Sequence, residues 1–112
     1  MLLYLLLLLL PRLGTLGFMS LGTEEVPGNM GTRDQVAALQ WIQENVSGFG
    51  GDPDLVTVMG QSAGSMATTF HMYSPLAHGL FRRVILQSGT GGFAPSYKHF
   101  EEDRAIKWDF EV

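Results

Sequence analysis

Residues 60–64 read Gly-Gln-Ser-Ala-Gly, and the serine of this segment, Ser62, has the setting that nucleophilic chemistry requires. An apolar, β-branched run at 55–59 precedes it, and a helix-compatible run follows and stops at Pro75. This order predicts a strand, a tight turn and a helix, with the Ser62 hydroxyl presented at the apex of the turn. We expect both glycines because a side chain at either position would collide with the neighbouring strand and helix.

A serine placed in this way is suited to acyl transfer. Its Oγ stands clear of the chain, and the first free N–H groups of the following helix point at the same space, where they can bind a developing oxyanion. The spacing Gly-x-Ser-x-Gly alone is common by chance, and the alternative for Ser62 is a small residue that fits a tight turn. The strand–turn–helix context is what indicates a nucleophile.

Composition excludes several other functions. The chain has 112 residues, which corresponds to one domain or less, and 46% of them are hydrophobic, so we expect a buried core. The net charge of −4 leaves no basic patch and argues against a nucleic-acid partner. Because there is no cysteine and the three histidines lack metal-ligand spacing, we predict neither a disulfide framework nor a metal site.

The elements that must position Ser62 follow from hydrophobic periodicity. Residues 32–46 read as a helix whose start can be capped by Thr32 or Asn29 and whose end is followed by a glycine cap, Gly48. Residues 63–73 read as a second helix, in which Met66 and Phe70 form the buried face and small residues, including Ala63, allow close packing on the sheet. Residues 83–87 read as a second strand. Helix, strand, helix and strand in this order predict an α/β fold with a parallel sheet and helices on its faces.

The ends of the chain are less regular. Residues 1–11 are a leucine-rich leader, for which a signal or anchor, a buried strand and a low-complexity stretch are three open interpretations. Residues 11–31 are glycine-rich and read as loop, whereas 98–112 form a charged tail without periodicity. Asn45 begins a glycosylation sequon, although a chance match at a helix end explains it equally well.

None of the histidines is suited to serve as the base for Ser62. His71 lies on the same predicted helix, where about nine residues carry it roughly 13 Å away, too far for a hydrogen bond. We therefore expect His71 to be a packing or surface residue, and His78 and His99 to lie in connectors.

Three acidic residues are candidates for the acid that orients a catalytic histidine. Because no suitable histidine is available for Asp34, Glu44 or Asp52, we expect them to cap helices or turns, or to pair with arginines such as Arg12.

Motifs on both sides of Ser62 follow one another in a familiar order. They occupy residues 12–18, 27–31, 34–35, 38–41, 43–45, 49–53, 60–64, 74–75, 79–81 and 86–89. From about residue 12 to residue 97 the chain closely resembles type-B carboxylesterases, the cholinesterase-like branch of the α/β-hydrolase fold. The resemblance implies a partial α/β-hydrolase fold, with parallel central strands, flanking helices and a nucleophile elbow.

The resemblance also implies the roles of single residues. Ser62 would be the nucleophile of a Ser–His–Glu/Asp triad, and the Ala63 backbone N–H would be one oxyanion donor. Ser88 would lie near the floor of the active site, and residues Gly60, Gln61 and Gly64 would surround the nucleophile. No metal or organic cofactor would be needed.

Gln61 narrows the expected substrate. Cholinesterases usually carry a glutamate just before the nucleophile, and this negative charge favours cationic substrates. A charge about 4 Å from a ligand cation contributes on the order of 1–4 kcal/mol. Since Gln61 lacks that charge, we expect a small, neutral carboxylic ester as substrate.

Several parts of the family pattern have no counterpart in the chain. The triad acid and histidine normally come well after the nucleophile, and the glycine-rich oxyanion loop normally precedes residue 12. We therefore expect an internal slice of a longer catalytic domain that is inactive alone. The alternatives are a non-catalytic, cholinesterase-like adhesion or binding protein and a truncated gene product with no activity. The family and the leucine-rich leader favour a secreted or membrane-associated location.

Overall fold

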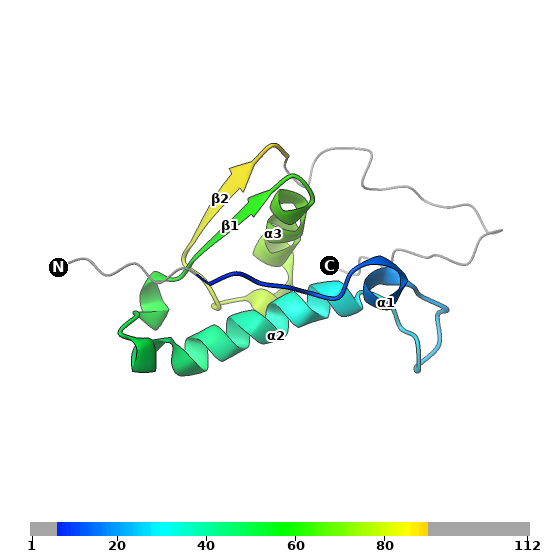
Figure 1. The fold of residues 1–112 in the computed structure, drawn as a ribbon, viewed down its shortest axis with the longest axis horizontal. Coiled ribbons are helices and arrows are strands. Elements are labelled where there is room, and N and C mark those ends of the chain that lie inside the picture. Colours follow the sequence, from blue (N-terminus) through cyan, green and yellow to red (C-terminus); the bar gives the residue numbers. More distant parts are fainter. Residues whose placement is uncertain (1–6, 90–112) are drawn as a thin grey trace.

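The computed structural model describes residues 7–89. Figure 1 shows two strands side by side, with helices beneath and beside them. The elements are α1 (Gly14–Phe18), α2 (Met30–Asn45), β1 (Thr57–Gln61), α3 (Ala63–Tyr73) and β2 (Arg83–Gln87), joined by short 3-10 helices at Val46–Phe49, Pro53–Leu55 and Pro75–Ala77. The charged tail, His99 and residues 1–6 of the leader lie outside the described residues.

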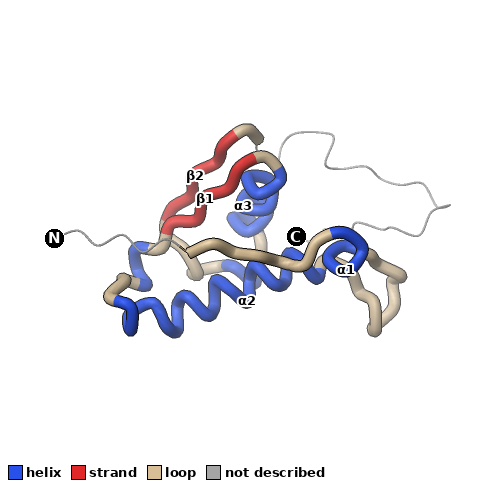
Figure 2. The backbone as a smooth tube through the Cα atoms, viewed as in Figure 1, coloured by secondary structure: helices blue, strands red, loops and turns tan. Residues whose placement is uncertain are grey.

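The two strands form a parallel sheet, as the order of elements predicted. The register runs from Thr57 opposite Arg83 to Gln61 opposite Gln87. A parallel pair requires a crossover, and α3 supplies it between the carboxyl end of β1 and the start of β2 (Figure 2). Both α3 and β2 have the bounds that the sequence predicted, whereas β1 begins at Thr57 rather than Leu55 because Leu55 ends a 3-10 helix.

The sheet has one covered face and one open face within the described residues. Helix α3 contacts both strands, and Gly60 faces it. Side chains alternate along a strand, so Val58 is half-buried while its neighbour Met59 is 59% exposed. Met59 lies opposite Ile85, which is 47% exposed, and the two form an apolar patch on the open face.

The hydrophobic core lies between α2 and the beginning of the sheet. Leu39, Ile42 and Val46 form the buried cluster, and their spacing along α2 is the one that predicted the helix. Partly buried residues packed against this cluster are Leu9, Val56, Val58, Leu80 and Phe81. Full burial of a side chain such as Leu39 contributes about 1.5–3 kcal/mol to folding.

The start of α2 has one of the two predicted caps, whereas its end differs from the prediction. The helix begins at Met30, so Thr32 lies inside it and Asn29 occupies the N-cap position, with a φ of 56°. At the other end the chain continues into the 3-10 helix Val46–Phe49, and the left-handed residue that ends this turn is Gly50, with a φ of 80°. The predicted cap at Gly48 was wrong because this extra turn postpones the reversal of the chain by two positions.

Helix α1 was not predicted, since residues 11–31 read as loop. It packs on α2, and the contact is close enough that a Cβ at Gly31 would lie 2.8 Å from the Phe18 ring. This tertiary contact stabilises a glycine-rich segment that has no helical periodicity of its own. In the leader, residues 7–10 form no strand, which disagrees with the buried-strand interpretation. No helix among residues 7–89 has the length and apolar composition needed to cross a membrane.

The sequon residue Asn45 is the last residue of α2. Its Nδ2 donates a hydrogen bond of 2.8 Å to the backbone oxygen of Trp41, one turn earlier. The side chain thus supports the end of the helix, and glycosylation at this position stays a prediction.

Candidate active site

Ser62 connects β1 to α3 in an unusual backbone conformation. Its φ and ψ are 51° and −118°, and it is exposed. A positive φ in a residue with a Cβ costs about 1–3 kcal/mol and persists only where the surroundings enforce it. Its carbonyl accepts bonds from Ser65 N and Met66 N at 2.9 and 3.1 Å, which starts α3 directly after the turn.

The two glycines that flank the turn, Gly60 and Gly64, differ in the space available for a side chain. A Cβ at Gly60 would lie 2.1 Å from the backbone oxygen of Gly64 and 2.6 Å from Ser65 N, so only glycine fits there. A Cβ at Gly64 would meet nothing within 4 Å among the described residues. The expectation that both positions exclude a side chain was therefore wrong for Gly64, which is exposed.

The start of α3 provides hydrogen-bond donors beside Ser62. Ala63 is its first residue and is exposed, and the first N–H groups of a helix have no acceptor within it. These groups and the positive end of the helix dipole can stabilise a negative charge. The geometry provides one exposed hydroxyl and backbone donors at the same turn, which is the arrangement that acyl transfer uses.

The end of β2 lies against this turn. The Ser62 N–H donates a 2.9 Å bond to the backbone oxygen of Gln87, the last residue of β2. Ser88 follows with a φ of 57°, a second strained residue, and a Cβ at Gly89 would lie 3.6 Å from the Ser62 oxygen. Ser88 is thus brought beside the turn, in the neighbourhood that the resemblance implied.

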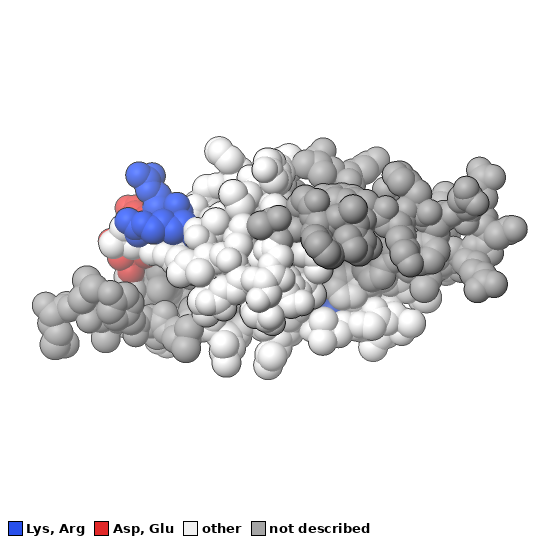
Figure 3. All heavy atoms as spheres, turned by 90° about the horizontal axis from the view of Figure 1, so that it is seen from above, with Lys and Arg blue, Asp and Glu red and all other residues white. Residues whose placement is uncertain are grey.

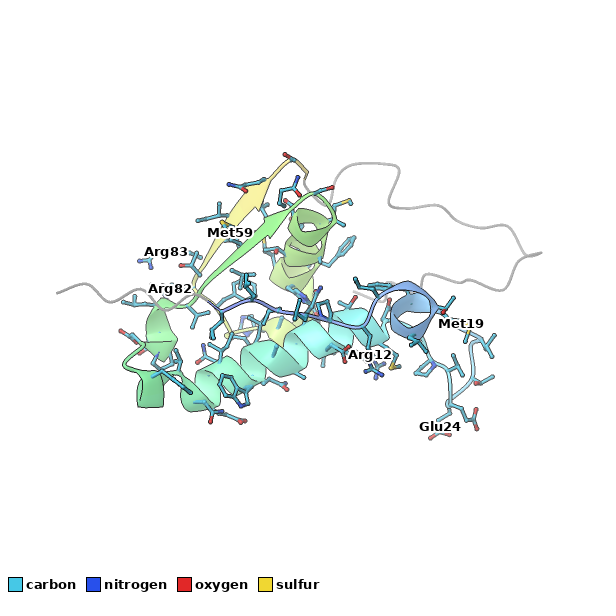
Figure 4. The ribbon with its side chains drawn as sticks, in the orientation of Figure 1. Arg12, Met19, Glu24, Met59, Arg82 and Arg83 are labelled. Atoms are coloured by element: carbon cyan, nitrogen blue, oxygen red, sulfur yellow. The ribbon has the colours of Figure 1, made fainter. Side chains whose placement is uncertain are left out.

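The two strands and the helix around Ser62 carry no charged side chain near the turn in the part of the chain that the structure describes. Residues 55–81 contain no Asp, Glu, Lys or Arg, and Gln61 is exposed next to Ser62. Charged side chains gather mainly at one end of the face drawn in Figure 3. Arg82 and Arg83 lie at this end, where the strands begin, whereas Ser62 follows the opposite end of β1 (Figure 4). No fixed charge of the described strands therefore lies beside the serine.

His71 is a packing residue, one of the two roles expected for it. It is only 4% exposed, and its Nε2 lies 2.7 Å from Gln35 Oε1, which joins α3 to α2. Nδ1 is buried with no hydrogen-bond partner among residues 7–89. Burial lowers the pKa of His71, because the charged ring loses its hydration. His78 is exposed in the connector before β2, as predicted.

The acidic candidates have structural roles in the described part of the chain. Asp34 accepts bonds from Arg12 Nε at 2.8 Å and from the Arg12 backbone N–H at 2.9 Å, and its second oxygen lies 2.7 Å from the guanidinium. These bonds to Arg12 lower the pKa of Asp34 to about 2. Asp52 caps the turn before β1 by accepting a bond from Asp54 N at 2.9 Å. Glu44 is exposed.

The sequence did not reveal the polar residues on the buried side of α3. Ser65, Thr68 and Thr69 are buried there, whereas Met66 and Phe70 are only half-buried and Ala63 is exposed. The predicted apolar face was therefore wrong in part. The signal available was the spacing of these hydroxyl residues by three and four positions, which places them on one side of a helix. Their hydroxyls have acceptors, since Thr68 Oγ1 donates to Gly64 O at 2.8 Å and Thr69 Oγ1 donates to Ser65 O at 3.0 Å.

A cavity of about 180 Å³ lies between the leader and α2. Its lining residues are Leu8, Leu9, Leu10, Pro11, Asp34, Gln35 and Ala38. None of them belongs to β1, α3 or β2, so this cavity is separate from the turn that carries Ser62.

Known proteins are similar to this chain in sequence. Residues 11–106 match the model of the carboxylesterase family. Esterase FE4 from Myzus persicae is 56% identical over 79 residues, which are 70% of this chain and 14% of that protein. Acetylcholinesterase from Gallus gallus is 54% identical over 80 residues, which are 70% of this chain and 10% of that protein.

The structure leads to the same family. The crystal structure of juvenile hormone esterase from Manduca sexta, with OTFP covalently attached, superposes with a TM-score of 0.71 and 56% sequence identity. The match covers 72% of this chain and 15% of that one, so the chain spans a small part of the length of its relatives. The chain belongs to the carboxylesterase family, and its described residues form part of an α/β-hydrolase fold.

Proposed function

We propose that the chain carries the nucleophile segment of a carboxylic ester hydrolase, with Ser62 as the nucleophile and the Ala63 N–H as an oxyanion donor. The observation that supports this most directly is the conformation of Ser62, which has a φ of 51° between a strand and a helix. Membership in the carboxylesterase family supports ester hydrolysis as the reaction.

In the proposed reaction the Ser62 Oγ attacks the carbonyl carbon of an ester while a histidine accepts the hydroxyl proton. The negative charge on the carbonyl oxygen is stabilised by backbone N–H groups that include Ala63. The alcohol leaves with the proton returned by the histidine, and water then cleaves the acyl–serine bond. Within residues 7–89 no hydrogen bond joins a histidine to Ser62, and His71 is bound to Gln35 instead. We therefore expect the 112-residue chain alone to be inactive.

A neutral ester is the substrate class that the surroundings favour. Gln61 and the end of β2 provide polar but uncharged groups, so a cationic substrate would find no fixed counter-charge there. In an esterase chimera that supplies the base and the acid, we expect Gln61→Glu to raise the preference for a cationic thiocholine ester over a neutral thioester by at least about fivefold, since a charge about 4 Å from a cation contributes on the order of 1 kcal/mol even in water. An unchanged preference would show that position 61 does not face the alcohol part of the ester.

The nucleophile is best tested in a protein that supplies the base and the acid. Residues 12–89 would replace the matching segment of Esterase FE4, which is 56% identical over 79 residues. The chimera is expected to hydrolyse p-nitrophenyl acetate, and Ser62→Ala to lower kcat by at least about 10⁴-fold. Ser47→Ala, at an exposed serine outside the strand–turn–helix segment, is the matched control and should retain the rate. Comparable rates for Ser62→Ala and Ser47→Ala would refute the proposed role.

The 112-residue chain provides the complementary measurement. Its hydrolysis of p-nitrophenyl acetate should not exceed that of its own Ser62→Ala variant, because no histidine among residues 7–89 is positioned to activate the serine. Turnover at enzyme-like rates that disappears in Ser62→Ala would contradict the expectation of inactivity and would support the nucleophile. A secreted or membrane-associated location belongs to the same proposal and is tested by fractionating cells that express the chain with its leader.

A further inference from the structure

Ser65 is the most deeply buried polar residue in the neighbourhood of the turn. It belongs to the first turn of α3, is 0% exposed, and its Oγ donates a hydrogen bond to the backbone oxygen of Gly89. The two residues are 24 positions apart, so this bond ties the beginning of α3 to the segment that follows β2. Through its backbone N–H, Ser65 also donates a 2.9 Å bond to the Ser62 oxygen.

A second bond joins the turn at Ser62 to the end of β2, and we call the turn and residues 87–89 together the junction. The Ser62 N–H donates to Gln87 O at 2.9 Å, so the bonds of Ser62 and Ser65 enclose Ser88 between Gln87 and Gly89. Both serines inside this junction have left-handed backbones, with a φ of 51° at Ser62 and 57° at Ser88. Such conformations persist where surrounding contacts over-determine them, and these two bonds hold the residues on either side of Ser88 to the turn.

The Gly89 segment and the turn are also in direct steric contact. A Cβ at Gly89 would lie 3.6 Å from the Ser62 oxygen and 3.9 Å from Met66 Cγ, so the backbone of Gly89 packs against the turn. Moving Gly89 away would remove one wall of the space that Ser62 occupies. Of the side chains in this junction, Ser65 is the one whose hydroxyl bonds Gly89 directly.

We propose that Ser65 is a positioning residue, whose hydroxyl holds residues 88–89 against the turn and thereby keeps Ser62 in the conformation that presents its Oγ. The chemical meaning of this role rests on the proposed function of Ser62, whereas the geometric part concerns the junction alone. Ser65 does not touch a substrate in this scheme and acts only through Ser62 and Gly89.

Amide hydrogen exchange of the full 112-residue chain, measured by NMR, tests the role. The Ser62 amide should exchange roughly tenfold faster in Ser65→Ala, because one hydrogen bond that opposes local opening is lost. The amides of Val58 and Ile85, inside the paired strands, should change less than about twofold, since the ladder bonds that they make in this register are unaffected.

Two further variants distinguish positioning from simple loss of a buried hydroxyl. Thr68→Val removes a buried hydroxyl from the same helix, but its acceptor is Gly64 within that helix, so the Ser62 amide should keep its protection. Ser65→Thr retains the donor oxygen and should restore protection of the Ser62 amide to within about threefold of the original chain.

The proposal is overturned if Ser65→Ala leaves the Ser62 amide unchanged, or if Thr68→Val accelerates it equally. Loss of protection across Val58, Ile85 and Ser62 together would assign Ser65 to overall stability and would also overturn the proposal. An unprotected Ser62 amide in the original chain would overturn it as well. Because exchange does not depend on the reactivity of Ser62, a Ser62 that fails to act as nucleophile in the chimera would leave these results intact.

Discussion

The glycine requirement of the turn offers a sharp test, since Gly60 and Gly64 occupy equivalent positions in the motif and opposite environments in space. Gly60→Ala would place a Cβ 2.1 Å from Gly64 O, 2.3 Å from Gly64 C and 2.6 Å from Ser65 N. All three atoms belong to the backbone, so no side chain can rotate away. The Gly64 oxygen is also held by the hydroxyl of Thr68 at 2.8 Å, which opposes the movement that would relieve the overlap.

Gly64→Ala is the matched control. The added methyl group meets nothing within 4 Å among the described residues, and Gly64 has no left-handed φ. Alanine in a helix is favoured over glycine by about 0.5–1 kcal/mol, because the unfolded chain loses less entropy on folding. Overpacking at Gly60 is expected to cost about 1–3 kcal/mol or somewhat more. The two variants should therefore differ by about 3 kcal/mol, which is more than a hundredfold in the folded-to-unfolded ratio.

Urea titration followed by circular dichroism measures this difference, with the free energies of unfolding compared at equal slopes. A difference of about 3 kcal/mol corresponds to roughly 12–24 °C in the midpoint of thermal unfolding for a chain of this size. Equal stability of Gly60→Ala and Gly64→Ala, or a more stable Gly60→Ala, would refute the contact between β1 and the start of α3 on which the geometry of the turn depends.

Two further predictions concern pH. The bonds from Arg12 lower the pKa of Asp34 from 3.8 to about 2, so the pair stabilises the folded chain above about pH 4 and this contribution is lost as the pH falls toward 2. Asp34→Asn should therefore reduce the change in the urea midpoint between pH 5 and pH 2. Burial lowers the pKa of His71 below 6.5, so the folded chain favours the neutral ring and stability should fall as the pH drops below 6.5. His71→Leu should remove this dependence and His78→Gln should retain it, whereas equal behaviour of the two variants would contradict the burial of His71.

Local sequence was sufficient for much of the fold. The bounds of α3 and β2 follow from short apolar runs with clear stop signals, Pro75 after one and Ser88–Gly89 after the other. Their parallel pairing followed from the length of the connection, because strands that are far apart in the chain need a crossover. The interior of α2 was equally clear, since its buried side chains repeat at helical spacing.

Two of the errors fall where separate elements of the chain meet. Helix α1 depends on packing against α2, and the turn excludes a side chain at Gly60 but not at Gly64 because of where β1 and the start of α3 approach each other. Neither contact leaves a periodic signal in the neighbouring residues, so helix propensity and residue spacing could not predict it.

The sequence by itself therefore determined the strand–turn–helix around Ser62, because the turn around Gly-x-Ser-x-Gly is defined by local backbone requirements. The motifs on both sides of it predicted the family. Tertiary structure decided which partners the polar residues take: Asp34 with Arg12 across 22 positions, His71 with Gln35 across 36, and Ser65 with Gly89 across 24. Such pairs depend on how the helices and strands pack in three dimensions, and sequence spacing carries no information about distances of that kind.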